Sequence, residues 1–338
     1  MKFVFLAPIH CLKMQGKHNK GLRINIGGYS ARITNTTDKF NRIIELDIAL
    51  GLDMNLFLYM GGFSSGEFIE NEATYLYIES EVHINNVERI SDFGNKFTFY
   101  LLRMIEYYIH YLWLYKDNSA YVRDGYLILK DDNPYYFNKS LSTINTTALG
   151  DIEPRIFTDS EFKQVNESVK CDLLGVGIDE KLSFQEIIDS DFMNVSKEIM
   201  TNMIKKERYY RSLFFLIFAR SKGQLAIKIA NYINSLECLF NTSNAELSHK
   251  MAERIALFIG SESNEKEKIY TKIKKAYSIR SKFVHGDIIN KDLEELCEIS
   301  TFLDEIIRKI YLDDIEYFNN ITEEKLNSLI FYTGRKNI

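Results

Sequence analysis

The chain has 338 residues, which is enough for two domains of ordinary size, each with its own core. Its hydrophobic fraction of 46% and charged fraction of 26% are those of a soluble globular protein. No stretch reaches the roughly 18 uncharged apolar residues that a membrane span needs. The net charge of −5 gives no general reason to bind nucleic acid, so any such binding must come from a local patch.

Four cysteines are scattered along the chain, with no Cys-x-x-Cys pair and no histidine at zinc-ligand spacing: Cys11, Cys171, Cys238 and Cys297. We therefore expect free thiols, a reducing cytoplasmic location, no metal site and no cofactor. The first ten residues begin like a signal peptide. Because the apolar run breaks at Pro8 and no small-residue cleavage site follows, we predict a first β-strand instead.

The amino-terminal half carries patterns of both strands and helix. Alternation and β-branched residues predict strands at Leu22–Ile26, Ile43–Leu50, Leu56–Tyr59, Thr74–Ile78 and Tyr121–Leu129. Apolar residues every three or four positions predict a helix over Asn95–Lys116. From Asn133 to Ser183 the pattern weakens, and we expect turns and short strands there. Residues 1–185 are thus predicted to form an α+β domain of unknown fold, with a sensing or docking role.

The carboxy-terminal half reads as an all-α helical bundle over residues 190–338, with short connections. Helices are predicted at Asn194–Lys206, Arg208–Phe240, Ala245–Ile259, Glu265–His285, Lys291–Leu312 and Glu323–Phe331. The second of these is expected to break or kink near Ser221–Gly223. The boundary between the two domains is expected between residues 170 and 195.

The helix predicted at Glu265–His285 has an unusual arginine. Its apolar stripe at heptad-like spacing consists of Ile269, Ile273, Ala276 and Phe283. Arg280 lies on this stripe, about one and a half turns from His285, and Gly286 follows. One interpretation is a partly buried arginine with an ion-pair partner, and a histidine that caps the last carbonyls. The other is a pair that binds phosphate and transfers protons.

A similar pair occurs in the amino-terminal half, on the helix predicted at Asn95–Lys116. Arg103 and His110 lie seven residues apart on one face among tyrosine and isoleucine, and we interpret them as structural. The less favoured alternative is that the chemistry of the protein takes place in the amino-terminal domain, at a catalytic centre around Arg103, Glu106 and His110. The spacing of Arg280 and His285 is equally weak as a signal when taken alone.

Three stretches of the carboxy-terminal half give Arg280 and His285 a context: Ile233–Phe240, Ala245–Gly260 and Ile273–Gly286. In this order and spacing, Arg211–Asp287 resembles the Apea-like HEPN family, a branch of the HEPN superfamily of helical ribonucleases. Arg280 and His285 match the Arg-x4-6-His signature of that superfamily. The resemblance implies a HEPN-type bundle with endoribonuclease activity, in an anti-phage defence or toxin role.

The chemistry of the two side chains agrees with what the resemblance implies. RNA is cleaved without metal when its 2′-hydroxyl attacks the adjacent phosphate, which needs a base, an acid and positive charge. An imidazole serves in either proton-transfer role near neutral pH, and a guanidinium matches phosphate oxygens. One histidine per chain is one group too few. The resemblance implies a homodimer or a higher homo-oligomer, in which two copies of Arg280 and His285 surround one phosphate.

Further residues are predicted to assist this site. The supporting residues are Ser281, Tyr277, Lys282 and Glu237, and the RNA-binding residues are Lys272, Lys274 and Lys275. Glu237, Glu253 and Arg254 are candidates for bracing Arg280 or His285. The expected partners are RNA, further copies of the chain and a phage-derived or other activating partner at the amino-terminal domain, without a membrane.

Two departures from the family pattern bear on activity. Ser281 follows the arginine, where many HEPN nucleases have Asn, Asp or His, so high activity is in question. Asp287 stands two after the histidine, where toxins silenced by a partner nucleotidyltransferase have Tyr, so that mode of control is not expected. The alternative hypothesis is a non-catalytic HEPN module for dimerisation or RNA binding, in a defence or regulatory complex.

Overall fold

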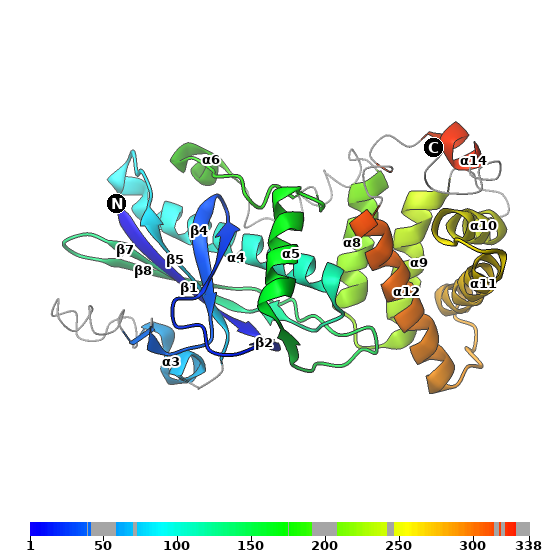
Figure 1. Ribbon diagram of the computed structural model, residues 1–338. Coiled ribbons are helices and arrows are strands. Elements are labelled where there is room, and N and C mark those ends of the chain that lie inside the picture. Colours follow the sequence, from blue (N-terminus) through cyan, green and yellow to red (C-terminus); the bar gives the residue numbers. More distant parts are fainter. Residues whose placement is uncertain are drawn as a thin grey trace. The chain divides into compact units, whose positions relative to one another are not determined.

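The computed structural model describes residues 1–38, 40–41, 59–69, 73–174, 176–190, 208–241, 247–313, 318 and 322–328. The chain forms two compact units (Figure 1). The first contains Met1–Ile144 and Glu153–Glu198, and the second contains Asn145–Ile152 and Ile199–Ile338. An α+β unit is thus followed by a helical unit, although the segment Asn145–Ile152 belongs to the second unit and was not anticipated.

An antiparallel sheet forms the centre of the first unit. Its strands are β1 (Lys2–His10), β3 (Leu22–Ile26), β4 (Tyr29–Thr34), β5 (Tyr75–Glu81), β6 (Tyr121–Val122), β7 (Asp124–Lys130) and β8 (Tyr135–Ser140). The order is β3-β4-β5-β1-β7-β8, and β6 pairs with the end of β1. In the central strand, Phe3 lies opposite Ser80 on one side and Leu129 on the other. Two short strands, β2 (Leu12–Met14) and β9 (Arg155–Phe157), form a separate parallel pair.

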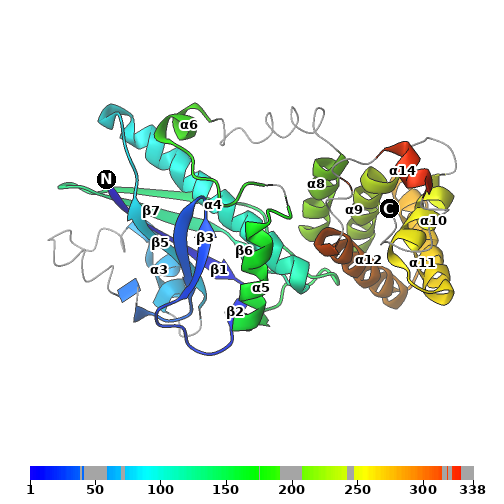
Figure 2. The same cartoon turned by 45° about the horizontal axis from the view of Figure 1, so that its top comes forward.

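The strand β1 is buried on both faces, which explains its nearly continuous apolar sequence. On one face Phe3 meets Phe97 of the long helix α4 (Ile90–Tyr115), with ring centroids 5.2 Å apart. Figure 2 shows α4 running across the strands. On the other face Val4 belongs to a core cluster with Phe68 of α3 (Gly62–Ile69). Successive side chains of a strand point to opposite faces, so β1 serves both layers.

Most of the sequence predictions for this unit are confirmed. The first strand and the strands at Leu22–Ile26 and Thr74–Ile78 are present, and the predicted helix begins earlier, at Ile90. The single strand predicted at Tyr121–Leu129 is divided at Arg123 into β6 and β7. The prediction for Ile43–Leu50 lies outside the described residues, as does Leu56–Leu58. The strand prediction at Tyr59 is wrong, because this residue is helical.

Two helices were missed. The helix α5 (Asp159–Lys170) lies in the region expected to hold turns and short strands, α6 (Phe184–Asp189) follows directly after that region, and each begins with a capping box. The Thr158 hydroxyl accepts from the Glu161 amide at 3.2 Å, while the Glu161 carboxylate accepts from the Thr158 amide at 2.8 Å. Such a reciprocal pair satisfies two otherwise unpaired amides at a helix start. In α5 the buried residues Phe162, Val165 and Val169 lie at helical spacing and were overlooked, whereas α6 is too short to show a period.

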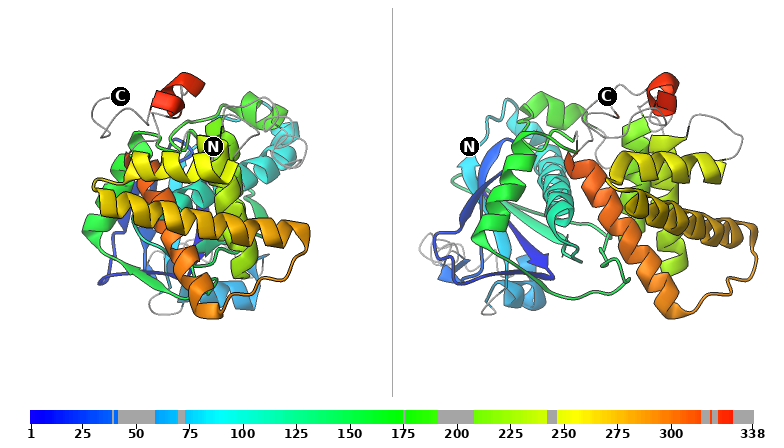
Figure 3. Two further views of the ribbon diagram at one scale, coloured as in Figure 1. Left: turned by 90° about the vertical axis from the view of Figure 1, so that its right-hand side faces the viewer. Right: turned by 45° about the vertical axis from the view of Figure 1, so that its right-hand side comes forward.

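The second unit consists of helices around α9. The described helices are α8 (Arg208–Arg220), α9 (Leu225–Phe240), α10 (Leu247–Ile259), α11 (Ser263–His285), α12 (Leu293–Asp313) and α14 (Glu323–Ser328). The break between α8 and α9 is confirmed, whereas the helix predicted at Asn194–Lys206 lies outside the described residues. Figure 3 shows α10 and α11 side by side. None of the described helices is both long and apolar enough to cross a bilayer.

Buried polar contacts hold α9 in place. The Tyr232 hydroxyl donates to the Asp304 carboxylate on α12 at 2.9 Å, and the Ser235 and Ser212 hydroxyls lie 2.8 Å apart between α9 and α8. These groups are fully or almost fully buried, so leaving one of them unpaired would cost about 1–3 kcal/mol. They fix the rotation of α9 about its axis and therefore the direction of its remaining side chains.

The segment Asn145–Ile152 is bound to the helical unit by similar contacts. The Thr146 hydroxyl donates to the Arg220 carbonyl at 2.9 Å, at the end of α8. The Ser300 hydroxyl on α12 donates to the Ala148 carbonyl at 2.6 Å. Sequence periodicity cannot show that this segment belongs to the helical unit, because its position depends on hydrogen bonds to residues far away in the sequence.

Gly94 on α4 is predicted to be intolerant of a side chain, because a Cβ at this position would overlap the ring of Phe137 on β8. We expect Gly94→Ala to destabilise the protein by about 1–3 kcal/mol, as overpacking does. Gly66 on α3 is the matched control, since a Cβ there meets nothing within 4 Å. Gly66→Ala should be neutral or stabilising by up to about 1 kcal/mol. Chemical unfolding compares the two, and equal stability of both variants would contradict the prediction.

Candidate functional site

The helix α11 ends with a backbone cap at Gly286. This glycine has φ 77°, a left-handed conformation that other residues adopt only with strain. The Asp287 amide donates to the Lys282 carbonyl at 2.9 Å, and the Gly286 amide donates to the Phe283 carbonyl at 3.3 Å. These two bonds form a cap of the Schellman type, so backbone amides and not His285 satisfy the last carbonyls.

His285 is therefore the last residue of α11, and its side chain is exposed. Within the described part of the chain, its imidazole forms no hydrogen bond or ion pair. The ring is available to a ligand or to a second protein molecule.

Arg280 is held from three sides. Its Nε donates to Asn234 Oδ1 at 3.2 Å, and its Nη2 donates to Glu237 Oε2 at 3.2 Å. The guanidinium also lies over the ring of Tyr277, 5.7 Å from the ring centroid. Asn234 and Glu237 are three residues apart on α9 and therefore share one helix face, which points at α11.

The guanidinium keeps part of its binding capacity. About a quarter (24%) of the Arg280 side chain is exposed. Among the described residues, Nη1 has no hydrogen-bond partner. A planar guanidinium offers five N–H donors, so an incoming anion would find Nη1 open while the other side is anchored.

Glu237 is an acid in an unfavourable environment. Its carboxylate is largely buried, and this burial raises the pKa of Glu237 above its usual value, although the Arg280 charge opposes the rise. The net direction shows that desolvation outweighs the attraction to Arg280. The ion pair therefore positions the arginine, but the desolvation of the Glu237 carboxylate offsets much of the attraction between the two charges.

Arg280 and His285 leave α11 in different directions. Five residues correspond to an axial rise of about 7.5 Å and a rotation of about 140° in an α-helix. Arg280 points toward α9, whereas His285 lies at the free end of the helix. In one copy of the chain, the two side chains therefore do not converge on a single point.

The apolar stripe predicted on α11 is partly wrong. Ile269, Ile273 and Ala276 are buried, but Phe283 is 40% exposed and Ile279 occupies the buried position instead. The helix continues past the part that is buried against its neighbours, so its last turn lies in solvent. Phe283 and Val284, next to His285 in the last turn of α11, are exposed, as are Ile288 in the following connection and Leu293 at the start of α12; we call these four residues the apolar end patch.

The lysines predicted to bind RNA have different surroundings. Lys272 pairs with Glu298 at 2.7 Å, and Lys275 lies 3.8 Å from Glu295, both on α12. Lys274 instead donates to the Ser248 hydroxyl on α10 at 3.4 Å. The three lysines thus do not form one basic patch, because two of them face carboxylates.

Of the remaining candidate residues, two lie beside Arg280 and another lies elsewhere in the helical unit. Ser281 and Lys282 are partly exposed beside Arg280 on α11. Arg254 is 4% exposed and donates to the Phe240 carbonyl at 2.5 Å and to Asn327 at 2.6 Å, so it supports the end of α9. Asn234 was missed, although its position one turn before Glu237 within Ile233–Phe240 was a usable signal.

The alternative centre on α4 is built differently. Arg103 forms an ion pair with Glu106 on the same helix and lies over the Phe99 ring. His110 is 3% exposed and belongs to the buried face of α4. This arrangement agrees with the structural interpretation.

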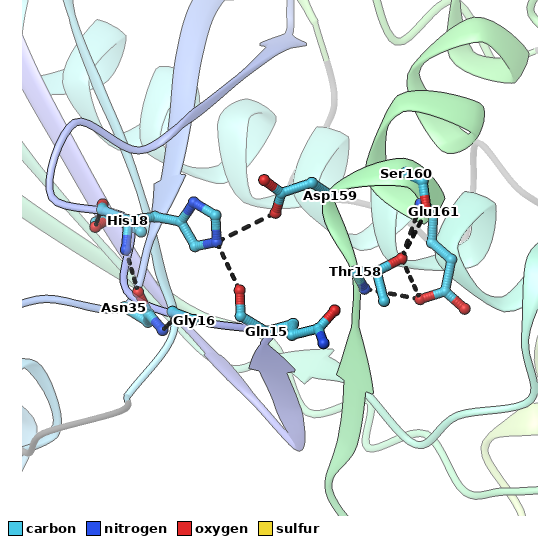
Figure 4. A network of polar contacts seen from close by, with 9 residues as sticks. Gln15, Gly16, His18, Asn35, Thr158, Asp159, Ser160 and Glu161 are labelled. Atoms are coloured by element: carbon cyan, nitrogen blue, oxygen red, sulfur yellow. Dashed lines mark hydrogen bonds and ion pairs between the residues drawn. The ribbon is translucent and has the colours of Figure 1, made fainter.

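A polar network orders one loop of the first unit (Figure 4). His18 Nε2 donates to the Gln15 carbonyl at 3.0 Å and lies 3.2 Å from Asp159 Oδ1 at the start of α5. Asn35 Oδ1 accepts from the His18 amide at 2.9 Å. The network borders an open cleft of about 550 Å³, lined by Lys13, Met14, Gln15, Lys17, Asn19, Thr36, Thr37, Asp38 and Ile156 among others. Sequence patterns gave no sign of this cleft.

Comparison with known proteins returns no relatives. No family model matches the chain, and neither a curated protein nor a solved structure matches it. Among the residues that the structure describes, no group of three or more His, Cys, Asp or Glu side chains is placed to hold a metal ion.

The raised pKa of Glu237 predicts a specific pH dependence. The folded chain holds the Glu237 proton more tightly than the unfolded chain, whose pKa is near 4.5. The free energy of unfolding of the wild type should therefore fall, relative to Glu237→Gln, as the pH rises through the window that begins near 4.5. Gln retains an oxygen that accepts from Arg280, so the comparison isolates the charge. Unfolding midpoints from pH 4 to pH 7 test this, and a constant difference would refute it.

Proposed function

We propose that the helical unit is a metal-independent endoribonuclease that acts as a homodimer. Arg280 holds the scissile phosphate, and His285 carries the proton transfers. The supporting observation is an anchored arginine with an open Nη1, on the same helix end as an exposed histidine. Ser281, Tyr277 and Lys282 are supporting groups, and Glu237 with Asn234 positions the guanidinium.

The proposed reaction needs only the groups that the chain supplies. A base accepts the proton of the 2′-hydroxyl, whose oxygen then attacks the adjacent phosphorus. The bond from phosphorus to the 5′-oxygen breaks, and an acid donates a proton to this oxygen. The products are a 2′,3′-cyclic phosphate and a 5′-hydroxyl. Imidazole is suited to both proton transfers, and the guanidinium stabilises the extra negative charge on the phosphorane-like transition state.

A second copy of the chain supplies the missing proton-transfer group. Phe283 and Val284 of the apolar end patch adjoin His285 in the sequence, and exposed apolar residues of this size at a helix end suit a contact with another protein molecule. An isologous contact through this patch would bring the two His285 side chains to one interface, each with its own Arg280 nearby. The dimer thus contains one base and one acid.

The biological role follows from the same proposal. An RNA-cleaving helical unit joined to an α+β unit suits an anti-phage or toxin effector, whose first unit receives an activating partner. The second candidate is a non-catalytic dimerisation or RNA-binding module. It is favoured by Ser281, which is a weaker hydrogen-bonding group than the residues expected at this position.

The catalytic assignment predicts loss of cleavage in two variants. Wild type, Arg280→Ala and His285→Ala are incubated with structured RNA in EDTA. We expect each variant to cleave at least about 100-fold more slowly than the wild type, because it lacks either charge stabilisation or a proton-transfer group. Lys268→Ala is the control, because Lys268 is exposed on the same helix and is remote from Arg280.

Cleavage that survives both substitutions would refute the assignment. Loss of cleavage in Arg103→Ala, with Arg280→Ala active, would move the chemistry to α4. Intact RNA with a preserved dimer and RNA binding would favour the non-catalytic module.

The dimer itself is tested at the apolar end patch. Val284 is 56% exposed, so Val284→Asp should fold normally but place a charge in the proposed interface. We expect light scattering to show a wild-type dimer and a Val284→Asp monomer of 39.5 kDa, with cleavage lost in the monomer. Val87→Asp is the matched control, because Val87 is 59% exposed in the other unit. A wild-type monomer that cleaves RNA would contradict the shared site.

A further inference from the structure

The helix α11 presents two polar edges, and their surroundings differ. The α12-side edge carries Lys268, Lys272 and Lys275, and the α10-side edge carries Tyr270, Lys274 and Tyr277. Side-chain contacts show which helix each edge faces. On the first edge, Lys272 and Lys275 lie near Glu298 and Glu295 of α12. Lys274 and Tyr270 reach Ser248 and His249 on α10.

Charge separates the two edges. On the α12 side, Glu298 accepts from Lys272, and this contact lowers the pKa of Glu298 below its usual value. Glu295 lies near Lys275 and also pairs with Lys291 at 2.6 Å. On the α10 side, Lys274 has no ion-pair partner among the described residues, and its side chain is exposed. An RNA phosphate would displace carboxylates on the first edge but not on the second.

Two of the six residues that define the edges are aromatic, Tyr270 and Tyr277, and both lie on the α10-side edge, whereas on the other edge Lys272 covers the ring of Phe302 of α12. Tyr277 lies under the Arg280 guanidinium. Tyr270 is partly exposed, and its hydroxyl is hydrogen-bonded to His249 Nδ1 at 2.9 Å, with the two rings at 86°. Alternation of cations and aromatic rings is the usual composition of a surface that binds single-stranded nucleic acid.

We propose that single-stranded RNA with its scissile phosphate at Arg280 extends along the α10-side edge of α11. Lys274 contacts the RNA backbone, and Tyr270 with His249 provides a surface on which a base stacks. This inference rests on the proposed function for the identity of the ligand. It assigns Lys272 and Lys275 to the attachment of α11 to α12, and it leaves only Lys274 of the three predicted lysines in contact with RNA.

The length of the edge sets the length of the bound strand. Ten residues separate Tyr270 from Arg280, which is a rise of about 15 Å in an α-helix. A stacked strand advances by about 3.4 Å per nucleotide, so this distance corresponds to about four nucleotides. A dinucleotide bound at Arg280 would therefore not reach Tyr270.

The test measures binding in the His285→Ala background, so that the RNA stays intact. The probes are a fluorescent ten-nucleotide single-stranded RNA and a dinucleotide. We expect Tyr270→Ala to weaken binding of the longer RNA by about 5- to 100-fold, the usual effect of losing one stacking surface, and to leave dinucleotide binding unchanged. Lys274→Glu should weaken binding of the longer RNA and reduce the dependence of its affinity on salt concentration.

Two further variants separate stacking from a structural effect. Tyr270→Phe keeps the ring but loses the hydrogen bond to His249, so it should bind the longer RNA almost like the background protein. Lys268→Glu introduces the same charge change as Lys274→Glu on the opposite edge of the helix, and we expect a much smaller effect. Thermal unfolding of each variant confirms that it is folded.

The outcomes distinguish this inference from the proposed function. Equal weakening by Lys268→Glu and Lys274→Glu, or unchanged binding in Tyr270→Ala, would overturn the RNA path even if the wild type cleaves RNA. Binding that depends on Tyr270 in a protein whose wild type never cleaves RNA would support the path and refute the nuclease. Absence of any RNA binding would refute both.

Discussion

The anchoring of Arg280 by Asn234 and Glu237 is the contact on which the candidate site depends. A guanidinium beside a buried apolar stripe loses hydration, so it needs acceptors that are already in place. Both acceptors project from α9, whose rotation is fixed by the contacts of Tyr232 and Ser235 with α12 and α8. The carboxylate of Glu237 is itself destabilised by burial. The open Nη1 of this arginine is the donor that remains for a further acceptor.

The fold was predictable from sequence wherever an element is long and has one apolar face. The helices α9 and α11 and the strand β3 were located in this way, because their periodicity reports which face is buried. The helix α6 was not, because short helices depend on end caps more than on periodicity. The place of Asn145–Ile152 in the second unit was not predictable, because it depends on hydrogen bonds from residues as distant in sequence as Ser300.

The site was predictable only in part, since its chemistry is shared between helices. Contact of Glu237 with Arg280 was anticipated, although the catalytic roles remain a prediction. The pairing of Lys272 with Glu298 was not anticipated, because a run of lysines on one helix does not reveal the acidic face of the helix beside it. Phe283 was assigned to the core because periodicity does not show where a neighbouring helix stops covering the face. Partner elements, and not the helix itself, decide these properties.

The position of the site at the carboxyl end of α11 adds a constraint of its own. A helix carries partial negative charge at this end, which favours a cation such as Lys282 but repels a phosphate. A single Arg280, already paired with Glu237, supplies little positive charge against that field. Two helix ends that meet at a two-fold axis would share one phosphate between two guanidinium groups and two imidazoles.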